Sequence, residues 1–477
     1  MAEKELSVVS LFSGAGGFDW GFHRAGFRTV LACELLKDAS ATLAHNLKLE
    51  ILKAPITPIV NGTPSVIHGD IQDVDFSAAA FSPDVLIGGP PCQDFSVVQV
   101  PQRPGLNGGR GQLYVEFVRA VMFFQPKIFV FENVPGLMSV NDQLVYTTIQ
   151  NDLENLEEKR LGALETGTGG PVPQQSVHSY KLLFSGVVDG TRVGVPQARR
   201  RLIIIGLRQD LADNLDELFE MPQLQNDLKK ELAGGDRLLW KYPLTCIEIF
   251  EGQPLNELQA KYVEIMEAYQ DILTDPTLPK AAEWRERVWD KLELKIVKDY
   301  YTANQLDYTK HDPVEFDKAM KEHRNLLENL GWLGKPVYEQ QFEDGSGTPP
   351  KETQAVTERM RRIPPDENSV FVNDTEWKVE SKDISFIYRR SAPLKPAWTV
   401  MAHGGGGTYG YHYERRRGRL SLRELARIQT FTDDFLFKGT GSSGMRAQIG
   451  EAVPPILAEH IAHAVREVLR RTSAQDG

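Results

Sequence analysis

A five-residue motif, Gly-Gly-Pro-Pro-Cys at positions 88–92, constrains the fold of this chain more than any other stretch. The apolar run 84–87 before it is typical of a buried strand. Two prolines cannot continue a helix or a sheet ladder, so the strand must end in a stiff loop that presents Cys92. Ligands of open α/β sheets bind at this end of the strands. A lone cysteine in a turn is more often a buried structural thiol, so the assignment of Cys92 depends on the rest of the chain.

The first 35 residues predict an α/β nucleotide-binding unit. An apolar strand over 6–12 leads into Ser-Gly-Ala-Gly-Gly-Phe at 13–18, and a helix follows to about Ala25. A second strand ends at Glu34, about 20 residues after the first glycine, where such folds place a carboxylate on ribose hydroxyls. The glycine pattern is not the full dinucleotide fingerprint. It therefore suits a nucleoside ligand without a pyrophosphate better than a nicotinamide dinucleotide.

Two further acids follow strand-like segments. Asp70 comes after the short strand 65–68 and is suited to accept a hydrogen bond from an adenine amino group. Glu132 follows the strand 127–131 and could face Cys92 across the same cleft. A turn or helix-cap aspartate or glutamate is the structural alternative for each. Strands that alternate with helices in this way predict an open α/β sheet.

The later part of the chain changes character. Arg199 and Arg201 enter a predicted strand, where alternate side chains share a face. Residues 209–333 are polar, acid-rich and helical in pattern, and their four tryptophans are predicted to anchor a second core. A capping box, Ser421 with Glu424, opens another helix, and a last amphipathic helix covers 456–469. We therefore expect residues from 209 to about 400 to form a second domain or a large insertion.

Composition limits the class of protein. Of 477 residues, 41% are hydrophobic, which is enough for a sizeable core. The three cysteines are widely spaced, which argues against a disulfide framework and against a CxxC zinc site, so no metal is expected. The charged N-terminus lacks the apolar core of a signal peptide, and no run of about 18 apolar residues predicts a membrane span. These features favour a reducing cytoplasm.

The formal net charge of −11 argues mildly against a polyanionic partner. Basic residues are nevertheless clustered, and each cluster could be either an ordinary solvated face or part of a nucleic-acid site. The clusters are Arg199 to Arg201; Arg359, Arg361 and Arg362; Arg389 and Arg390; and Arg415 to Arg417 with Arg419.

Six motifs, taken in their order along the chain, resemble those of the C5-cytosine DNA methyltransferases. They are Phe-Ser-Gly-Ala-Gly-Gly at 12–17, Pro-Pro-Cys-Gln at 90–93, Glu-Asn-Val at 132–134, Gln-Ala-Arg-Arg-Arg at 197–201, the helix at 421–431, and Gly-Glu-Ala-Val-Pro-Pro at 450–455. The resemblance implies a doubly wound, Rossmann-like α/β fold that binds S-adenosyl-L-methionine. It also implies a catalytic and cofactor-binding domain over 1–208, completed by 440–477, to which the last helix returns. A smaller domain over 209–439 would carry target recognition.

The chemistry of cytosine methylation suits these residues. C5 of cytosine is a poor nucleophile until a thiolate adds to C6, and Cys92 would be that thiolate. Glu132 would supply a proton or strong hydrogen bond at N3, and Arg201 would hold O2 and steady Glu132. Arg199 would support the loop or contact the nucleotide, which must leave the duplex to react. The Gly-rich and Arg-rich segment 97–112 is predicted to close over the base.

The resemblance also implies a set of cofactor-binding residues. They are Phe12, Gly14, Gly16, Gly17, Glu34, Asp70, Ile71, Gly89, Pro91, Leu113, Glu451 and Val453. One of them departs from the family pattern, because Glu451 stands where the family usually carries Asn. The added charge there is expected to loosen or reshape the cofactor pocket.

The main hypothesis is a monomeric enzyme that methylates double-stranded DNA in the cytoplasm, at the nucleoid, and protects it from a separate restriction endonuclease of the same specificity. An RNA cytosine methyltransferase is the alternative within the enzyme class. A catalytically silent DNA-binding relative and a dinucleotide dehydrogenase with a chance cysteine are the alternatives outside the methyltransferases. Intact Cys92, Glu132, Arg199 and Arg201 argue against the catalytically silent relative.

Overall fold

The computed structural model describes residues 5–55, 63–78, 81–91, 113–139, 143–166, 172–379, 387–403, 406–439 and 441–473. The chain forms two compact units. The first contains residues 1–189, 200–236 and 452–477, and the second contains residues 190–199 and 237–451. These boundaries differ from those of the predicted domains at residues 190–199, 209–236 and 440–451.

A single sheet forms the core of the first unit, in the order β3-β4-β2-β1-β5-β6-β8-β7. Neighbours from β3 to β6 are parallel, whereas β8 is antiparallel to both β6 and β7. The order reverses at β1, which is the doubly wound arrangement, so the predicted fold class is confirmed. The strands are β1 (Leu6–Leu11), β2 (Phe27–Glu34), β3 (Glu50–Lys53), β4 (Ser65–His68), β5 (Val85–Gly88), β6 (Ile128–Asn133), β7 (Tyr180–Asp189) and β8 (Arg200–Arg208).

Strand β3 was not predicted from the sequence. Its burial pattern is exposed at three of its four residues, so it lacks the apolar run that marks the other strands. It is fixed instead by its partner, because Glu50 to Lys53 pair with Ser65 to His68 of β4. An edge strand of this kind takes its structure from tertiary pairing more than from its own pattern.

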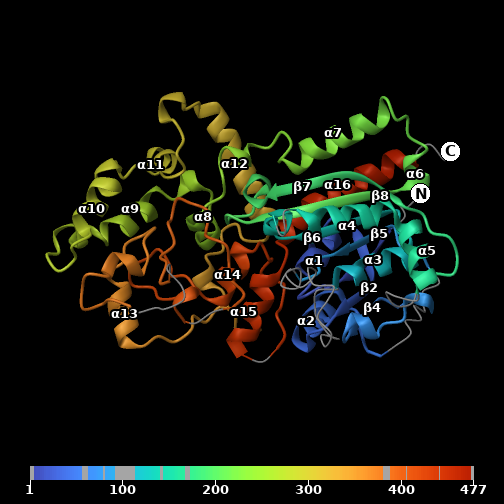
Figure 1. The fold of residues 1–477 in the computed structure, drawn as a ribbon. Coiled ribbons are helices and arrows are strands. Elements are labelled where there is room, and N and C mark those ends of the chain that lie inside the picture. The colour runs from blue at the N-terminus through green and yellow to red at the C-terminus, as the bar shows by residue number, and fades with distance from the viewer. Residues whose placement is uncertain are drawn as a thin grey trace. The chain divides into compact units, whose positions relative to one another are not determined.

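The C-terminal helix α16 (Pro455–Ser473), drawn in red in Figure 1, completes the first unit. It packs closely on α1 (Gly17–Arg24), because a Cβ at Gly21 would lie 2.4 Å from the Cβ of Ala458. Arg24 Nε donates to Glu459 Oε2 at 2.8 Å across the same contact. The other helices of this unit are α2 (Lys37–Leu47), α3 (Leu113–Phe124), α4 (Leu144–Glu154), α5 (Leu156–Thr166), α6 (Gln209–Ala212) and α7 (Glu220–Leu232).

The second unit is helical where the structure describes it, with short connections and isolated bridges in place of a sheet. Trp284 and Trp332 are buried in it as predicted, and Trp289 is half-buried. The prediction for Trp240 is wrong, because 57% of it is exposed. Its helices are α8 (Cys246–Glu251), α9 (Gln259–Glu267), α10 (Ala281–Arg287), α11 (Ile296–Ala303), α12 (Pro313–Asn329), α13 (Gln354–Met360), α14 (Leu422–Ile428) and α15 (Gly441–Glu451).

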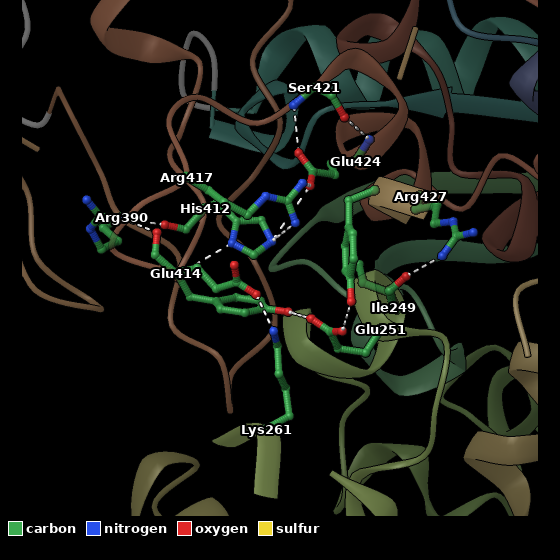
Figure 2. A network of polar contacts seen from close by, with 12 residues as sticks. Ile249, Glu251, Lys261, Arg390, His412, Glu414, Arg417, Ser421, Glu424 and Arg427 are labelled. Carbon is green, nitrogen blue, oxygen red and sulfur yellow. Dashed lines mark hydrogen bonds and ion pairs between the residues drawn. The ribbon is translucent and has the colours of Figure 1, made fainter. Parts of the chain in front are cut away.

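A buried polar network holds the second unit together around His412 (Figure 2). The backbone N–H of Glu414 donates to His412 Nδ1 at 3.0 Å, and Arg417 lies 3.0 Å from His412 Nε2. Arg417 also donates to Glu424 Oε1 at 2.7 Å, while the N–H of Ser421 donates to Glu424 Oε2 at 2.7 Å. Burial, reinforced by the Arg417 guanidinium, holds the pKa of His412 well below its usual value, so the imidazole is neutral.

Several arginines of the predicted basic clusters are structural. Arg390 is completely buried and donates to the carbonyls of His412 and Ile363, at 2.6 and 2.7 Å. Arg361 pairs with Glu358 in its own helical turn, and Arg419 donates to the Tyr411 hydroxyl at 3.3 Å. These side chains satisfy internal acceptors, so the number of arginines in a cluster overstates its charge available to a partner.

No helix within the described ranges is long and apolar enough to cross a membrane.

A buried ion pair of the second unit predicts a pH dependence of stability. Both ring nitrogens of His323 are engaged, Nδ1 with Glu248 Oε1 at 2.7 Å and Nε2 with the carbonyl of Tyr242 at 2.9 Å. Burial alone would lower the pKa of His323, but the Glu248 carboxylate more than offsets this and raises it above its usual 6.5. The stabilisation is therefore fully present below pH 6.5 and is lost as the pH rises through the folded-state pKa.

We expect His323→Gln to lower the free energy of unfolding by about 3–5 kcal/mol at pH 6, because it leaves a buried carboxylate uncompensated. The difference from the wild type should shrink at pH 9. Urea unfolding at the two pH values measures this. Glu293→Gln, which removes an exposed ion pair with Lys298, is the control and should change little. A wild-type advantage that grows with pH would contradict the assignment.

Candidate active site

The predicted acid and arginine meet at the carboxyl end of β6. Arg201 Nε lies 2.8 Å from Glu132 Oε1, and the two side chains are only 13% and 12% exposed. Arg201 Nη1 donates in addition to the carbonyl of Arg200 at 2.8 Å, which fixes the guanidinium. Glu132 is therefore held in one orientation at a strand end by a charge-assisted contact.

Gly89 and Asn133 shape the loop that leads to Cys92. A Cβ at Gly89 would lie 2.7 Å from Glu132 Oε2, so only glycine allows the carboxylate to sit there undisturbed. Asn133 Nδ2 donates to the carbonyl of Pro90 at 2.9 Å, and its Oδ1 accepts from the N–H of Val134, also at 2.9 Å. The end of β6 thus holds both the acid and the first proline of the loop. Pro91 is exposed at the end of the described segment.

Cys92 and the predicted lid over 97–112 lie outside the described residues. The other two cysteines are described and are buried. Burial raises the pKa of both thiols, Cys33 and Cys246, to about 12. Neither can supply a thiolate at neutral pH, which leaves Cys92 as the candidate nucleophile.

The glycine turn between β1 and α1 is built for close approach of a ligand. Gly14 and Gly16 adopt positive φ angles of 55° and 89°. A Cβ at Gly16 would lie 2.4 Å from Leu43 Cδ1, whereas one at Gly14 would meet nothing within 4 Å. Gly17 begins α1, and Phe12 is partly buried beside the turn. Open space over a glycine backbone fits a nucleoside cofactor.

Glu34 closes the other side of this turn. Its Oε2 accepts from the N–H of Gly14 at 2.7 Å, and its Oε1 accepts from the N–H of Leu36 at 2.8 Å. These two hydrogen bonds hold the Glu34 carboxylate against the glycine turn. The predicted spacing between the glycine turn and Glu34 therefore corresponds to a direct contact.

Asp70 and Ile71 follow β4, and Arg119 of α3 holds the segment that carries them. Arg119 donates to the carbonyls of Ile71 and Val74, at 2.9 and 3.0 Å, and stacks over the Phe76 ring. Asp70 caps the short turn after β4 by accepting from the N–H of Gln72 at 3.0 Å. Leu113 begins α3 and packs against the core of the first unit.

Arg199 and the last motif are described within the second unit as far as Glu451. Arg199 precedes β8, is buried, and donates to the carbonyl of Gly450 at 2.8 Å. A Cβ at Gly450 would lie 2.4 Å from the N atom of Ala402, so this turn also requires glycine. Glu451 Oε1 lies 2.9 Å from His403 Nε2. Val453 is buried in the first unit.

Three side chains of this region were not predicted to matter. Arg119 and Asp19 are charged positions on otherwise apolar helix faces, and Asn133 follows a predicted catalytic acid. An ionisable residue in the middle of an apolar face is the signal that could have identified the first two. Within the described ranges, no group of three or more His, Cys, Asp or Glu side chains could hold a metal ion.

Comparison with known proteins gives a consistent result. Residues 6–161 and 176–467 match the family described as C-5 cytosine-specific DNA methylase. The chain is 48% identical to the DNA (cytosine-5-)-methyltransferase M.ApeKI of Aeropyrum pernix, over 97% of this chain and 98% of the relative. It is 29% identical to the type II methyltransferase M.NgoFVII of Neisseria gonorrhoeae, over 94% and 83% of the two chains.

One solved structure, of a prophage-encoded E. coli protein described as a DNA modification methyltransferase, shares the fold. The TM-score is 0.52 at 22% sequence identity, over 98% of this chain and 100% of that one. The family match covers nearly the whole chain, including all six of the motifs and the Glu132–Arg201 pair. The chain therefore belongs to the C-5 cytosine-specific DNA methylase family and is a DNA cytosine-5-methyltransferase.

Proposed function

We propose that Cys92, Glu132 and Arg201 carry out the methylation of a cytosine that has left the DNA duplex. The Glu132–Arg201 pair at the end of β6 is the observation that carries this proposal, because it fixes an acid beside the Pro90–Pro91 loop. The buried, unreactive state of Cys33 and Cys246 supports Cys92 as the nucleophile.

The Cys92 thiolate adds to C6 of the base and converts the ring into an enamine with a nucleophilic C5. Glu132 donates a proton or a strong hydrogen bond at N3, which makes this addition easier. Arg201 binds the O2 atom and keeps Glu132 in position. After C5 has gained the methyl group, the C5 proton leaves, the Cys92–C6 bond breaks, and the ring is restored.

We propose the glycine turn, Glu34 and the segment after β4 as the binding site of S-adenosyl-L-methionine, which supplies the methyl group when bound. Open space at Gly14, the Glu34 carboxylate that accepts from the Gly14 N–H, and the hydrogen bond from Arg119 to the Ile71 carbonyl support this assignment. The proposed residues are Phe12, Gly14, Gly16, Gly17, Glu34, Asp70, Ile71, Gly89, Pro91, Leu113, Glu451 and Val453.

Arg199 and His403 are proposed as positioning residues. The Arg199 guanidinium donates to the carbonyls of Gly450 and Val400. These contacts favour a role in supporting this turn over contact with the nucleotide. The His403 imidazole lies against Glu451, where its Nε2 is placed to donate a hydrogen bond to the carboxylate that replaces the usual Asn.

The second unit is proposed to recognise the DNA target. Arg389 and Trp398 line a hollow of about 50 Å³, and the Arg389 guanidinium lies 5.2 Å from the centre of the Trp398 ring. About 10–15 Å³ admits one water, so this hollow suits a phosphate or a base edge and not a whole nucleotide. An arginine stacked on an aromatic ring presents its N–H groups in one plane, which suits phosphate oxygens.

We further propose that the chain acts as a monomer on double-stranded DNA in the cytoplasm and is accompanied by a separate restriction endonuclease. The type II names of several relatives support the last point. The gene next to that of this chain should then encode an endonuclease whose cleavage is blocked by the methylation.

The first prediction of this proposed function concerns Cys92. DNA from cells that express the wild type should carry 5-methylcytosine in one sequence motif, and Cys92→Ser should abolish it, because a hydroxyl is a far weaker nucleophile than a thiolate. Bisulfite sequencing measures this, with cellular RNA sequenced in parallel. Cys246→Ser is the control and should keep the motif. Methylation by Cys92→Ser, or methylation confined to RNA, would contradict the proposal.

The second prediction concerns the acid. Glu132→Gln should lower kcat by about 10²–10⁴-fold, because an amide cannot protonate N3. Arg201→Lys should lower it as well, since lysine cannot hold both Glu132 and the Arg200 carbonyl as the guanidinium does.

Arg208→Lys, at the other end of β8 in a pair with Asp210, is the matched control. It should leave kcat close to the wild-type value. Single-turnover methylation with saturating DNA separates these effects from binding. An Arg208→Lys enzyme as slow as Arg201→Lys would show that the strand itself, and not the site, had been damaged.

The third prediction concerns DNA binding. Arg389→Ala should weaken binding to all DNA sequences and reduce the slope of log K against log salt by about one, as expected for one lost phosphate contact. Arg285→Ala, which removes an equally charged but exposed side chain of α10, should leave the slope unchanged. A loss confined to the cognate motif would assign Arg389 to base recognition instead.

A further inference from the structure

Asp19 is a fully buried acid beneath the glycine turn, and the proposed chemistry does not use it. It lies on α1 with no exposed surface. Ser10 Oγ of β1 donates to its Oδ2 at 2.9 Å, and Thr29 Oγ1 of β2 donates to its Oδ1 at 3.1 Å. Burial, which these hydrogen bonds only partly offset, raises the pKa of Asp19 to about 6.

A second hydroxyl links this acid to the turn, because Ser10 Oγ and Ser13 Oγ are 2.9 Å apart. Ionised Asp19 can only accept, so the Ser10 proton points to Asp19 and Ser13 must donate to Ser10. Protonated Asp19 can donate to Ser10 instead. Ser10 then donates to Ser13, and the Ser13 proton turns to the carbonyl of Ser10 or Cys33, at 3.3 and 3.4 Å. The protonation state of Asp19 thus sets the direction of a hydrogen-bond relay.

The relay ends in the turn that the proposed cofactor site uses. The N–H of Ser13 donates to the carbonyl of Cys33 at 3.2 Å, and the N–H of Gly16 donates to the carbonyl of Ser13 at 2.9 Å. Glu34, next to Cys33, accepts from the N–H of Gly14. Ser13 therefore joins the turn to the end of β2, immediately before the carboxylate proposed to bind ribose.

Other charged groups around α1 are engaged elsewhere. Glu34 is the charged group whose field raises the pKa of Asp19, in addition to burial. On the α16 side, Glu459 binds Arg24, and Arg466 donates to the carbonyl of Ala25. On α1 itself, His23 stacks on Trp20.

We propose that Asp19 is a positioning residue that acts on the cofactor site through Ser10 and Ser13. The protein binds the cofactor more tightly when Asp19 is ionised. The inference rests on the proposed cofactor site. The ionised carboxylate directs the Ser13 proton to Ser10, whereas the protonated acid leaves the Ser13 proton to the carbonyls of Ser10 and Cys33 in the turn. By linkage, a ligand that prefers the ionised state must release a proton when it binds near pH 6.

Calorimetric titration of the full chain with S-adenosylhomocysteine from pH 5 to pH 8 tests this. The wild-type Kd should fall several-fold between pH 5 and pH 7, with a midpoint near 6. At pH 6 the binding enthalpy should depend on the ionisation enthalpy of the buffer, which reports proton release. Asp19→Asn should show neither effect. The control is Asp84→Asn, which changes a buried carboxylate bound to Ser7 and should keep the wild-type pH dependence.

An Asp19→Asn protein with the wild-type pH dependence would overturn the inference. Should Asp19→Asn fail to fold, Ser13→Ala serves in its place, because it keeps the acid and cuts the relay. Its pH dependence should be flat, and a wild-type profile would again overturn the inference. Failure of the wild type to bind S-adenosylhomocysteine at any pH would overturn the cofactor site itself, and the inference with it.

Discussion

The antiparallel pairing of β6 with β8 is the constraint on which the proposed chemistry depends. Glu132 of β6 lies opposite Ile203 of β8. Arg201 is two residues from Ile203 along β8, so the Arg201 and Ile203 side chains lie on the same face of the sheet. A slip of one residue would move Arg201 to the other face and leave Glu132 as an uncompensated, nearly buried charge. The apolar residues Leu202 to Ile205, all completely buried, fix this register because they cannot face water. Hydrophobic burial thus places the ion pair that we propose to be catalytic.

Several arginines of the second unit lie in its interior and not on its surface. Arg390, Arg423 and Arg427 are completely buried, and they bind carbonyls or carboxylates of their own unit. A buried guanidinium is tolerated only when its donors are satisfied, so each such arginine fixes several loops at once. The described residues of this unit form no sheet, and buried polar contacts connect its loops and helices instead.

Much of the first unit could be predicted from the sequence, because apolar strands that end in glycine, acid or proline carry strong local signals. The succession of these strands along the chain, the glycine turn and the Glu132–Arg201 pair follow from such signals and from the family pattern. The exposed edge strand β3 and the positions of Trp240 and Arg390 could not be predicted, since burial there is decided by contacts with residues far away in the sequence. For the same reason the Asp19 relay could not be predicted, because it needs Asp19 of α1, Ser10 of β1 and Ser13 of the glycine turn to meet.

The close contact of α1 with α16 has a consequence for the order in which the protein is made. The first helix of the chain packs on the last, with Gly21 against Ala458 and Arg24 on Glu459. A ribosome must therefore synthesise residues 237–451 before the N-terminal helix can meet its partner. At about 5–20 residues per second this delay is on the order of ten to forty seconds. During that time the face of α1 that receives α16 stays open on the nascent chain, so the N-terminal unit begins first and finishes last.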